Sequence, residues 1–422
     1  MKRGLVWFTE DLRLDDNETL LKSIEENEEV LPVYFWAEHE KKSQFGILRI
    51  GDTRKEFIQE SLANLQQQLN AIGGSLLVLN GSPEDLMTDL CKQFGIRKVY
   101  AKKQVGSEEK STQLLVKQRL LEISVDFETY STSTLFHPDD LPFSVRDIPL
   151  LFTKFRKLAE KESIVRSPFN PPERIAVPPF KQFPIERTSS SKPAWLQGGE
   201  DHALQRLHYF IWESQAVKTY KETRDQLAGL DFSTKFSAWL SQGCISPRRI
   251  YSEIKRFEHQ VLANDSTYWV IFELLWRDFF RFSFKKYPQA YFQLHGLDQN
   301  ARYTDFDERK FAAWTQGRTS EALINAGMNE LRETGFVSNR MRQILASYWV
   351  FGMQQDWRYG AAWFEYCLVD YDVASNWGNW AYIAGVGNDN RGGREFNVEK
   401  QTQLFDRDGV YREKWTYSNK GT

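Results

Sequence analysis

The chain has 422 residues, too many for one ordinary domain, so two domains with a large shared core are expected. Its formal net charge of only -2 argues against a surface coated with basic residues for indiscriminate nucleic-acid binding, although a local basic patch remains compatible with it. The three cysteines, Cys91, Cys244 and Cys367, form no CxxC pair and no cysteine–histidine spacing, so no metal site is expected and a reducing cytoplasm suits them.

The N-terminus begins MKRGLVWFTEDLRLDD and reaches acidic residues after a very short apolar run, so it does not resemble a signal peptide. No stretch of the sequence approaches the length of a membrane span. A soluble, cytoplasmic protein without membrane contact is therefore expected.

Short apolar runs alternate with amphipathic stretches over residues 1–130. The apolar runs predict buried parallel strands at residues 4–8, 30–36, 75–81 and 98–101. The stretches between them have helical periodicity, and Ser82 and Pro83 occupy the cap and first turn of one predicted helix. This pattern indicates a doubly wound α/β domain. The first strand is not followed by G-x-G-x-x-G, so a dinucleotide bound in the usual Rossmann manner is not expected.

Proline, serine and lysine dominate residues 131–197, which predicts a linker that crosses the surface. Residues 198–422 are aromatic and helical in pattern. Long periodic segments predict an all-α second domain, with helices over residues 202–227, 246–264, 267–286, 321–355 and 359–371.

Three segments of the second domain carry side chains suited to ligand chemistry. Residues 233–237 read STKFS and place hydroxyls, a cation and backbone N–H groups before a helix, as a phosphate site does. Taken alone, they are also an ordinary helix start. Within residues 267–286, Glu273, Trp276 and Arg277 share one helix face, although a Glu-to-Arg pair at i,i+4 is also common on a core helix.

The third segment, residues 369–397, mixes buriable carboxylates with tryptophans, amides and glycines. Asp370 and Asp372 need hydrogen-bond donors if they are buried. Such a stretch can surround a flat ligand edged with donors and acceptors, such as an isoalloxazine or a nucleobase. A tryptophan-rich core that ends in a glycine loop is the structural alternative.

These segments together resemble the photolyase/cryptochrome family over nearly the whole chain. TRDQLAGLDFSTKFSAWLSQGCISPR is similar to the cryptochrome DASH branch, ELLWRDF resembles the family's E-L-x-W-R-[DE]-F, and GFVSNRMRQ resembles its T-G-F-x-S-N-R-x-R-Q. The resemblance implies a photolyase-like fold with FAD bound in a U shape among the C-terminal helices. It implies cofactor contacts at Tyr220, Ser233, Thr234, Lys235, Phe236, Ser237, Glu273, Arg277, Asn339, Arg342, Asp370, Asp372 and Asn376.

The implied activity is that of a deoxyribodipyrimidine photolyase, which uses reduced, light-excited FAD to split cyclobutane pyrimidine dimers, mainly in single-stranded DNA. The lesion would be met by Glu273, Trp276, Asn339, Arg340, Gln343 and Tyr382. Trp380 and Trp357 match two members of the family's electron-transfer chain, and Tyr303 is a candidate for the third. No histidine follows His295, so the paired histidines of six-four photolyases are absent.

The resemblance also allows an antenna between the two domains, often a folate such as methenyltetrahydrofolate. Gln104 lies near where a ligating carboxylate belongs, with Glu108 and Glu109 nearby. Oligomeric state is not readable from the sequence, and a monomer is the default expectation. Two alternatives remain: a blue-light photoreceptor with little or no repair activity, and a nucleic-acid binder whose cofactor chemistry is vestigial.

Overall fold

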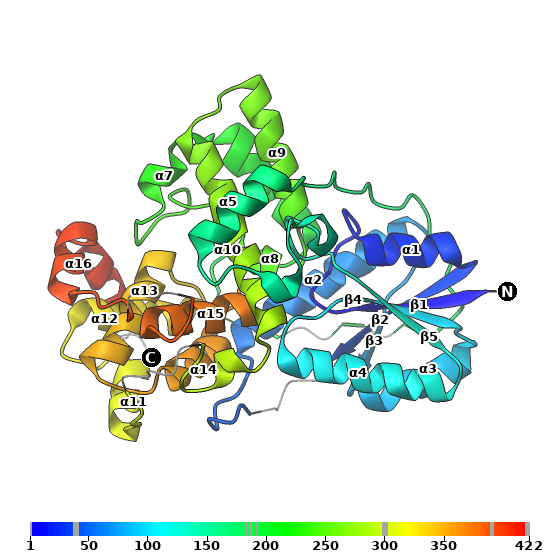
Figure 1. Cartoon of the computed structure of the whole chain (residues 1–422), viewed down its shortest axis with the longest axis horizontal. Helices are drawn as coiled ribbons and strands as arrows, with labels where there is room; N and C mark the ends of the chain where they lie inside the picture. The colour runs from blue at the N-terminus through cyan, green and yellow to red at the C-terminus, as the bar shows by residue number, and fades with distance from the viewer. Residues whose placement is uncertain are drawn as a thin grey trace.

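The chain is described by a computed structural model that covers residues 2–36, 42–182, 184–185, 188–190, 192–297, 303–388 and 392–417. An N-terminal α/β part and a C-terminal helical part lie side by side, with α2 (Asp52–Ala71) between them (Figure 1). The two-part architecture expected from the sequence is therefore confirmed.

The N-terminal part is built on a five-stranded sheet in the order β3-β2-β1-β4-β5, and all its pairings are parallel. Four predicted strands are present as β1 (Arg3–Phe8), β2 (Glu29–Trp36), β3 (Leu77–Asn80) and β4 (Lys98–Lys102). The fifth, β5 (Asp126–Tyr130), was not predicted. It is a partly exposed edge strand with the sequence DFETY, which lacks the apolar run of a buried strand.

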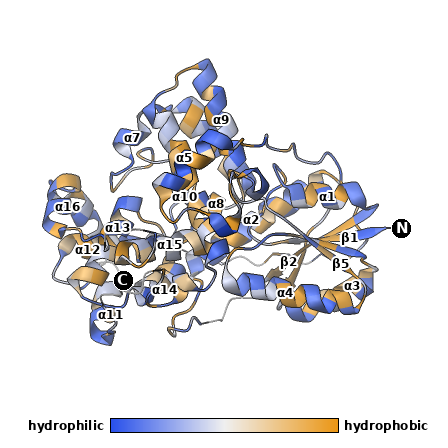
Figure 2. Ribbon diagram, in the orientation of Figure 1, coloured by the Kyte–Doolittle hydropathy of each residue, from blue (hydrophilic) through white to orange (hydrophobic). Residues whose placement is uncertain are grey.

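Alternate residues of β1 face opposite layers of helices. Val6 and Phe8 belong to the core that includes α1 (Glu18–Glu26) and α2 (Asp52–Ala71). Leu5 and Trp7 belong to a second core with α3 (Pro83–Phe94) and α4 (Ser107–Glu122). The first of these cores continues into the C-terminal helices, and Figure 2 shows hydrophobic residues gathered along α2 and α10 (Asp265–Lys286) between the two parts.

The segment predicted as a linker contains a helix. After the short turns η1 (Pro138–Asp140) and η2 (Val145–Asp147), α5 (Phe152–Glu162) buries Phe152, Phe155 and Ala159. Phe155 packs against Phe279 of α10 with 5.4 Å between ring centroids. The proline-rich sequence on either side concealed the helical period of this stretch.

Most of the predicted C-terminal helices are present with different boundaries, but the helix predicted over residues 321–355 is divided into α12 (Ala322–Thr334), α13 (Asn339–Ser347) and the π-helix η6 (Tyr348–Gly352). The region 202–227 is broken into α6 (Glu200–His208), the π-helix η3 (Tyr209–Glu213), η4 (Ala216–Thr219) and α7 (Tyr220–Thr223). The break falls at Gln215, whose φ of 52° lies in the left-handed region. The remaining helices are α8 (Ser237–Ser241), α9 (Pro247–Gln260), α10 (Asp265–Lys286), η5 (Ala290–Phe292), α11 (Glu308–Thr315), α14 (Trp357–Cys367), α15 (Val373–Ala384), α16 (Val398–Phe405) and α17 (Val410–Tyr417).

Buried polar groups join the two parts of the chain. The carboxylate of Glu200 on α6 accepts hydrogen bonds from the N–H groups of Leu14 and Asp15, each at 2.8 Å. Asp278 on α10 accepts from the N–H groups of Leu135 and Phe136, each at 2.9 Å. Across the described ranges, no helix combines the length and apolar character needed to cross a bilayer.

Candidate functional site

A cavity within the helical part is lined by residues from α13, α14, α15 and the segment that precedes α15. Its lining includes many of the residues predicted to contact the cofactor or lesion, namely Asn339, Arg342, Gln343, Asp370, Asp372, Asn376 and Trp380. In sequence these residues belong to two separate segments, 339–343 and 370–380. The fold therefore brings them to one locus.

Asp370 and Arg342 form an ion pair, so Arg342 supplies a donor that the buried carboxylate needs. Arg342 Nη2 lies 2.8 Å from Asp370 Oδ2, and the Asp370 side chain is 1% exposed. Arg342 Nε also donates to the carbonyl oxygen of Val337 at 3.0 Å, which fixes the guanidinium. The other carboxylate oxygen of Asp370 is buried without a hydrogen-bond partner among the described residues. It is an acceptor ready for an N–H group at the edge of a flat ring.

Asp372 caps α15 and binds a buried arginine. Its Oδ1 accepts from the N–H of Ser375 at 2.8 Å, and its Oδ2 pairs with Arg281 of α10. Burial disfavours the charged carboxylate, but the guanidinium groups of Arg281 and Arg277 outweigh it and lower the pKa of Asp372 to about 2. The cap is therefore an anion at neutral pH.

The first turns of α15 carry Asn376 and Trp380 to the cavity. Asn376 donates from Nδ2 to the carbonyl oxygen of Ala361 at 3.0 Å, which sets the orientation of its amide. Gly378 lies on another side of the helix, where a Cβ atom would be 2.4 Å from Phe280 of α10. A glycine is needed there because α10 and α15 approach so closely.

One face of α10 contacts three elements of the site. Glu273 Oε1 pairs with Arg224 at 2.7 Å, and Arg277 Nη2 donates to the carbonyl oxygen of Leu240 at 3.0 Å. Arg281 then pairs with Asp372. Sequence reasoning missed Arg281, although its i+4 spacing from Arg277, on the same face as Glu273, was a usable signal.

The expected lesion residues Trp276 and Tyr382 are neighbours, with ring centroids 5.8 Å apart. Phe152 of α5 stacks on Trp276 with 3.7 Å between centroids, so the unpredicted helix supports this ring. Arg394 donates to the Tyr382 hydroxyl. Arg340 pairs with Asp225 at 2.7 Å, next to the Arg224–Glu273 pair. These residues form a second group outside the cavity.

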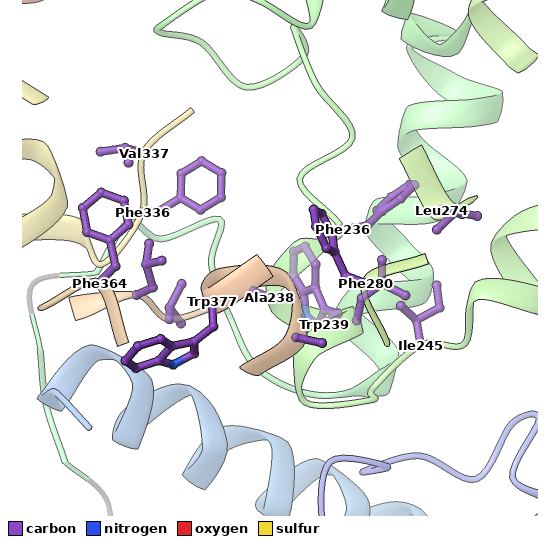
Figure 3. Close-up of a cluster of buried hydrophobic side chains, with 14 of the residues drawn as sticks. Phe236, Ala238, Trp239, Ile245, Leu274, Phe280, Phe336, Val337, Phe364 and Trp377 are labelled. Carbon is purple, nitrogen blue, oxygen red and sulfur yellow. The ribbon is translucent and has the colours of Figure 1, made fainter. Parts of the chain in front are cut away.

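The predicted phosphate loop, residues 233–237, also lies outside that cavity. Phe236 is buried against Phe210 at 5.8 Å between centroids, Ser237 is exposed, and Tyr220 is buried. Figure 3 shows Phe236 near Phe280 and Leu274, and Phe336 and Phe364 on the opposite side of the view. Lys235 is only 5% exposed, and its Nζ lies 3.7 Å from the Phe232 ring centroid. Burial lowers the pKa of Lys235 to about 7.

The tryptophans of the expected electron-transfer chain are buried in the aromatic core. Trp380 packs against Phe364 at 5.0 Å and Trp314 at 6.2 Å between centroids. Trp357 packs against Trp377 at 5.9 Å, and its Nε1 donates to the carbonyl oxygen of Leu294. Tyr303 contacts Phe351 at 6.2 Å. The contact between Trp314 and Trp380 was not predicted from the sequence.

A separate cavity lies between the carboxyl ends of the parallel strands and the start of α15. Glu10 and Lys102 form an ion pair in its wall, and Gln104 donates to Glu10 Oε2 at 3.0 Å. Glu108 pairs with Arg49 at 2.7 Å and also lines the cavity, as does Glu109. The predicted antenna residues Gln104, Glu108 and Glu109 thus line the same cavity. Within the described residues, no group of three or more His, Cys, Asp or Glu side chains is placed to hold a metal ion.

Comparison with known proteins agrees with this geometry. The family model described as DNA photolyase matches residues 4–174, and that described as the FAD binding domain of DNA photolyase matches residues 269–420. A cryptochrome DASH of Synechocystis sp. is 42% identical over 97% of this chain and 86% of its own length, and one of Danio rerio is 42% identical over 97% and 82%. A crystal structure of a Synechocystis cryptochrome superposes with a TM-score of 0.93 at 41% identity, covering 98% of this chain and 88% of the other. The chain therefore belongs to the photolyase/cryptochrome family, in its cryptochrome DASH branch.

Proposed function

We propose that this protein is a light-driven, FAD-dependent photolyase that repairs cyclobutane pyrimidine dimers, preferentially in single-stranded DNA. The observation that carries the proposal is the cavity in which Asp370, Arg342, Asn376 and Trp380 converge. When bound, reduced FAD would supply a light-excited electron for splitting the cyclobutane ring.

The residues of the cavity suit an isoalloxazine ring. The free oxygen of Asp370 accepts an N–H group, and the neighbouring Arg342 guanidinium stabilises negative charge on the ring. Asn376, oriented by the carbonyl oxygen of Ala361, presents its amide at the ring. The loop of residues 233–237 and Tyr220 would hold the diphosphate.

The lesion would be received by Trp276, Glu273 and Tyr382. An extruded base can stack on Trp276, and such stacking contributes roughly 1 to 3 kcal/mol per base. Glu273, which pairs with Arg224, offers carboxylate oxygens that can accept from a pyrimidine imide N–H. A dimer stacks poorly in its strand, so flipping it costs less than flipping an intact base, and this difference favours damaged sites.

The direct test illuminates purified, flavin-reduced protein with a single-stranded oligonucleotide that contains one thymine dimer. Recovery of thymine absorbance is the expected result, and a duplex with the same dimer should recover more slowly. Absence of recovery on both substrates, with FAD bound, would contradict repair and favour a photoreceptor.

Replacing Glu273 by alanine should depress repair strongly while leaving flavin absorbance unchanged, because the lesion base loses its acceptor and the other implied FAD contacts remain. The matched control is Glu160→Ala. Glu160 is 31% exposed and Glu273 is 32% exposed, and both are ion-paired on helices. Loss of FAD from the Glu273→Ala protein would show that Glu273 is structural.

Binding of the damaged strand should weaken with salt. The log-log slope for single strands is about -0.7 for each phosphate neutralised. Arg340→Ala should reduce the magnitude of the slope by about one such contact. An affinity that does not depend on salt would exclude a basic contact surface.

We also propose that the cavity between the sheet and α15 holds an antenna chromophore, of which a folate is the expected type. One similar structure is described as an archaeal photolyase from Sulfolobus tokodaii with two FAD molecules, with a TM-score of 0.81 and 25% identity. Tyr371 and Asp372 line both this cavity and the flavin cavity, so a chromophore here would lie close to the flavin. A visible absorption spectrum of the purified protein distinguishes folate from flavin bands.

A further inference from the structure

A buried arginine, not part of any motif described above, lies beside the loop of residues 230–234. Arg206 is on α6 and is 8% exposed. Its guanidinium donates four hydrogen bonds of 3.1 Å to this loop, received by the carbonyl oxygens of Leu230, Ser233 and Thr234 and by the Asp231 carboxylate. A single side chain thus fixes one side of the loop.

The direction of these carbonyl groups determines where the N–H groups point. In a planar trans peptide the carbonyl and the following N–H point in opposite directions. Because the carbonyls of Ser233 and Thr234 face Arg206, the N–H groups of Thr234 and Lys235 face away from it. Within the described part of the chain, neither N–H donates a hydrogen bond to another protein group.

Two further features make this outer side suitable for an anion. Lys235 has a φ of 61°, and Phe236 after it is in the right-handed region with φ of -72°. Successive N–H groups in such a mixed conformation, beginning here with that of Lys235, converge on a small concavity that binds anions, and the Phe236 N–H also donates to the Thr234 hydroxyl at 3.4 Å. The hydroxyls of Ser233 and Thr234 belong to the same turn.

We propose that Arg206 is the positioning residue of the diphosphate loop: it holds the carbonyl groups on one side so that the N–H groups of Thr234 and Lys235 are presented to the FAD diphosphate. This inference rests on the proposed FAD function. Arginine is required because its planar guanidinium supplies several N–H donors in fixed directions. A lysine ammonium in the same place would reach fewer of the carbonyl oxygens and would not fix their orientation.

The test measures dissociation constants of FAD and riboflavin for the flavin-free wild-type, Arg206→Lys and Arg412→Lys proteins by fluorescence titration. Riboflavin has no phosphate, so its dissociation constant depends on the contacts to the flavin ring and not on contacts to the diphosphate. The matched control, Arg412 of α17, donates to both the carboxylate and the carbonyl oxygen of Asp406, at 2.8 and 3.1 Å. Arg206→Lys should weaken FAD about tenfold or more and riboflavin less than about threefold, because only phosphate contacts are disturbed. Arg412→Lys should change neither constant.

A second variant covers the case in which Arg206→Lys does not fold. The Asp231 side chain is 41% exposed, so Asp231→Ala removes one acceptor of Arg206 at the surface. It should weaken FAD about threefold and spare riboflavin.

Unchanged FAD affinity in the folded variants overturns the role of Arg206, as does an equal loss for FAD and riboflavin. If the wild-type protein binds neither ligand, the proposed FAD function fails as well. If the wild-type binds FAD and Arg206→Lys binds it equally well, only the inference about Arg206 fails.

Discussion

Lys235 is a single residue whose burial is costly for folding, and the proposed binding of FAD would account for that burial. Its amine is enclosed by the rings of Phe232, Phe336 and Trp195, and among the described residues it forms no ion pair with a carboxylate. Burial therefore lowers the pKa of Lys235 to about 7 from its ordinary value of 10.5. The flavin-free protein binds fewer protons here than the unfolded chain between these two values, so its stability should rise as the pH increases from 7 to 10.5.

Lys235→Met should consequently stabilise the flavin-free protein at pH 7 by more than about 1 kcal/mol, remove that part of the pH dependence, and weaken FAD. Urea unfolding at pH 7 and 9, with FAD titration, measures all three effects. Lys285→Met is the control, since burial also lowers the pKa of Lys285 to about 7 at a place away from the loop. That variant should gain stability without losing FAD affinity. Weaker FAD binding in both variants would contradict a specific role for Lys235.

At the scale of elements, α15 depends on an N-cap with two functions. Asp372 accepts the Ser375 N–H and neutralises the buried Arg281. Asparagine preserves a cap but removes the charge. Asp372→Asn should therefore lower the unfolding free energy at pH 7 by roughly 3 to 5 kcal/mol, because a buried guanidinium loses its anion.

The matched control is Asp307→Asn at the N-cap of α11. Asp307 is exposed and, among the described residues, accepts only from backbone N–H groups, those of Arg309 and Lys310. Its substitution should change stability by about 0.5 kcal/mol or less. The folded pKa of Asp372 is about 2 against an ordinary 3.8, so its stabilising effect is present above pH 3.8 and is lost as the pH falls toward 2. The difference between wild-type and Asp372→Asn should shrink over that window in urea unfolding. Equal losses at Asp372 and Asp307 would show that capping alone matters.

Elements with a strong local period could be predicted from the sequence, and those defined by tertiary packing could not. The run YWVIFELLWRDFFRF predicted α10 because its apolar residues recur at helical spacing. Glu273 and Arg277 are also four residues apart, which places them on one helix face. In contrast, β5 is polar at an edge and α5 lies within proline-rich sequence. The site residues could be named from motifs, but the Arg206 contacts and the Phe152–Trp276 stack join segments far apart in sequence, which no local pattern encodes.

At the scale of the whole molecule, the two parts of the chain meet through a buried polar contact. Arg13 donates to four carbonyl oxygens, which belong to Asp15, Asp16, Thr132 and Gly243. A Cβ atom on Gly243, where φ is 66°, would lie 2.2 Å from the carbonyl oxygen of Glu10, so the two backbones can approach only at glycine. Arg248 donates two hydrogen bonds, of 2.9 and 2.6 Å, to the Asp16 carboxylate. We therefore expect both parts to unfold in one transition.

Arg248→Gln tests this interface. Its side chain is 4% exposed and that of Asp16 is 0% exposed, so the substitution leaves a buried carboxylate without its partner, and the unfolding free energy should fall by roughly 3 to 5 kcal/mol. Arg166→Gln is the control, because Arg166 binds Asp140 with the same fork at 2.6 and 2.9 Å but with side chains 39% and 27% exposed. Solvent screens that pair, and its loss should cost about 1 kcal/mol or less. Urea unfolding followed by circular dichroism and by tryptophan fluorescence, which reports mainly the helical part, measures both variants. Two separate wild-type transitions, or equal losses in the two variants, would show that the interface does not couple the two parts.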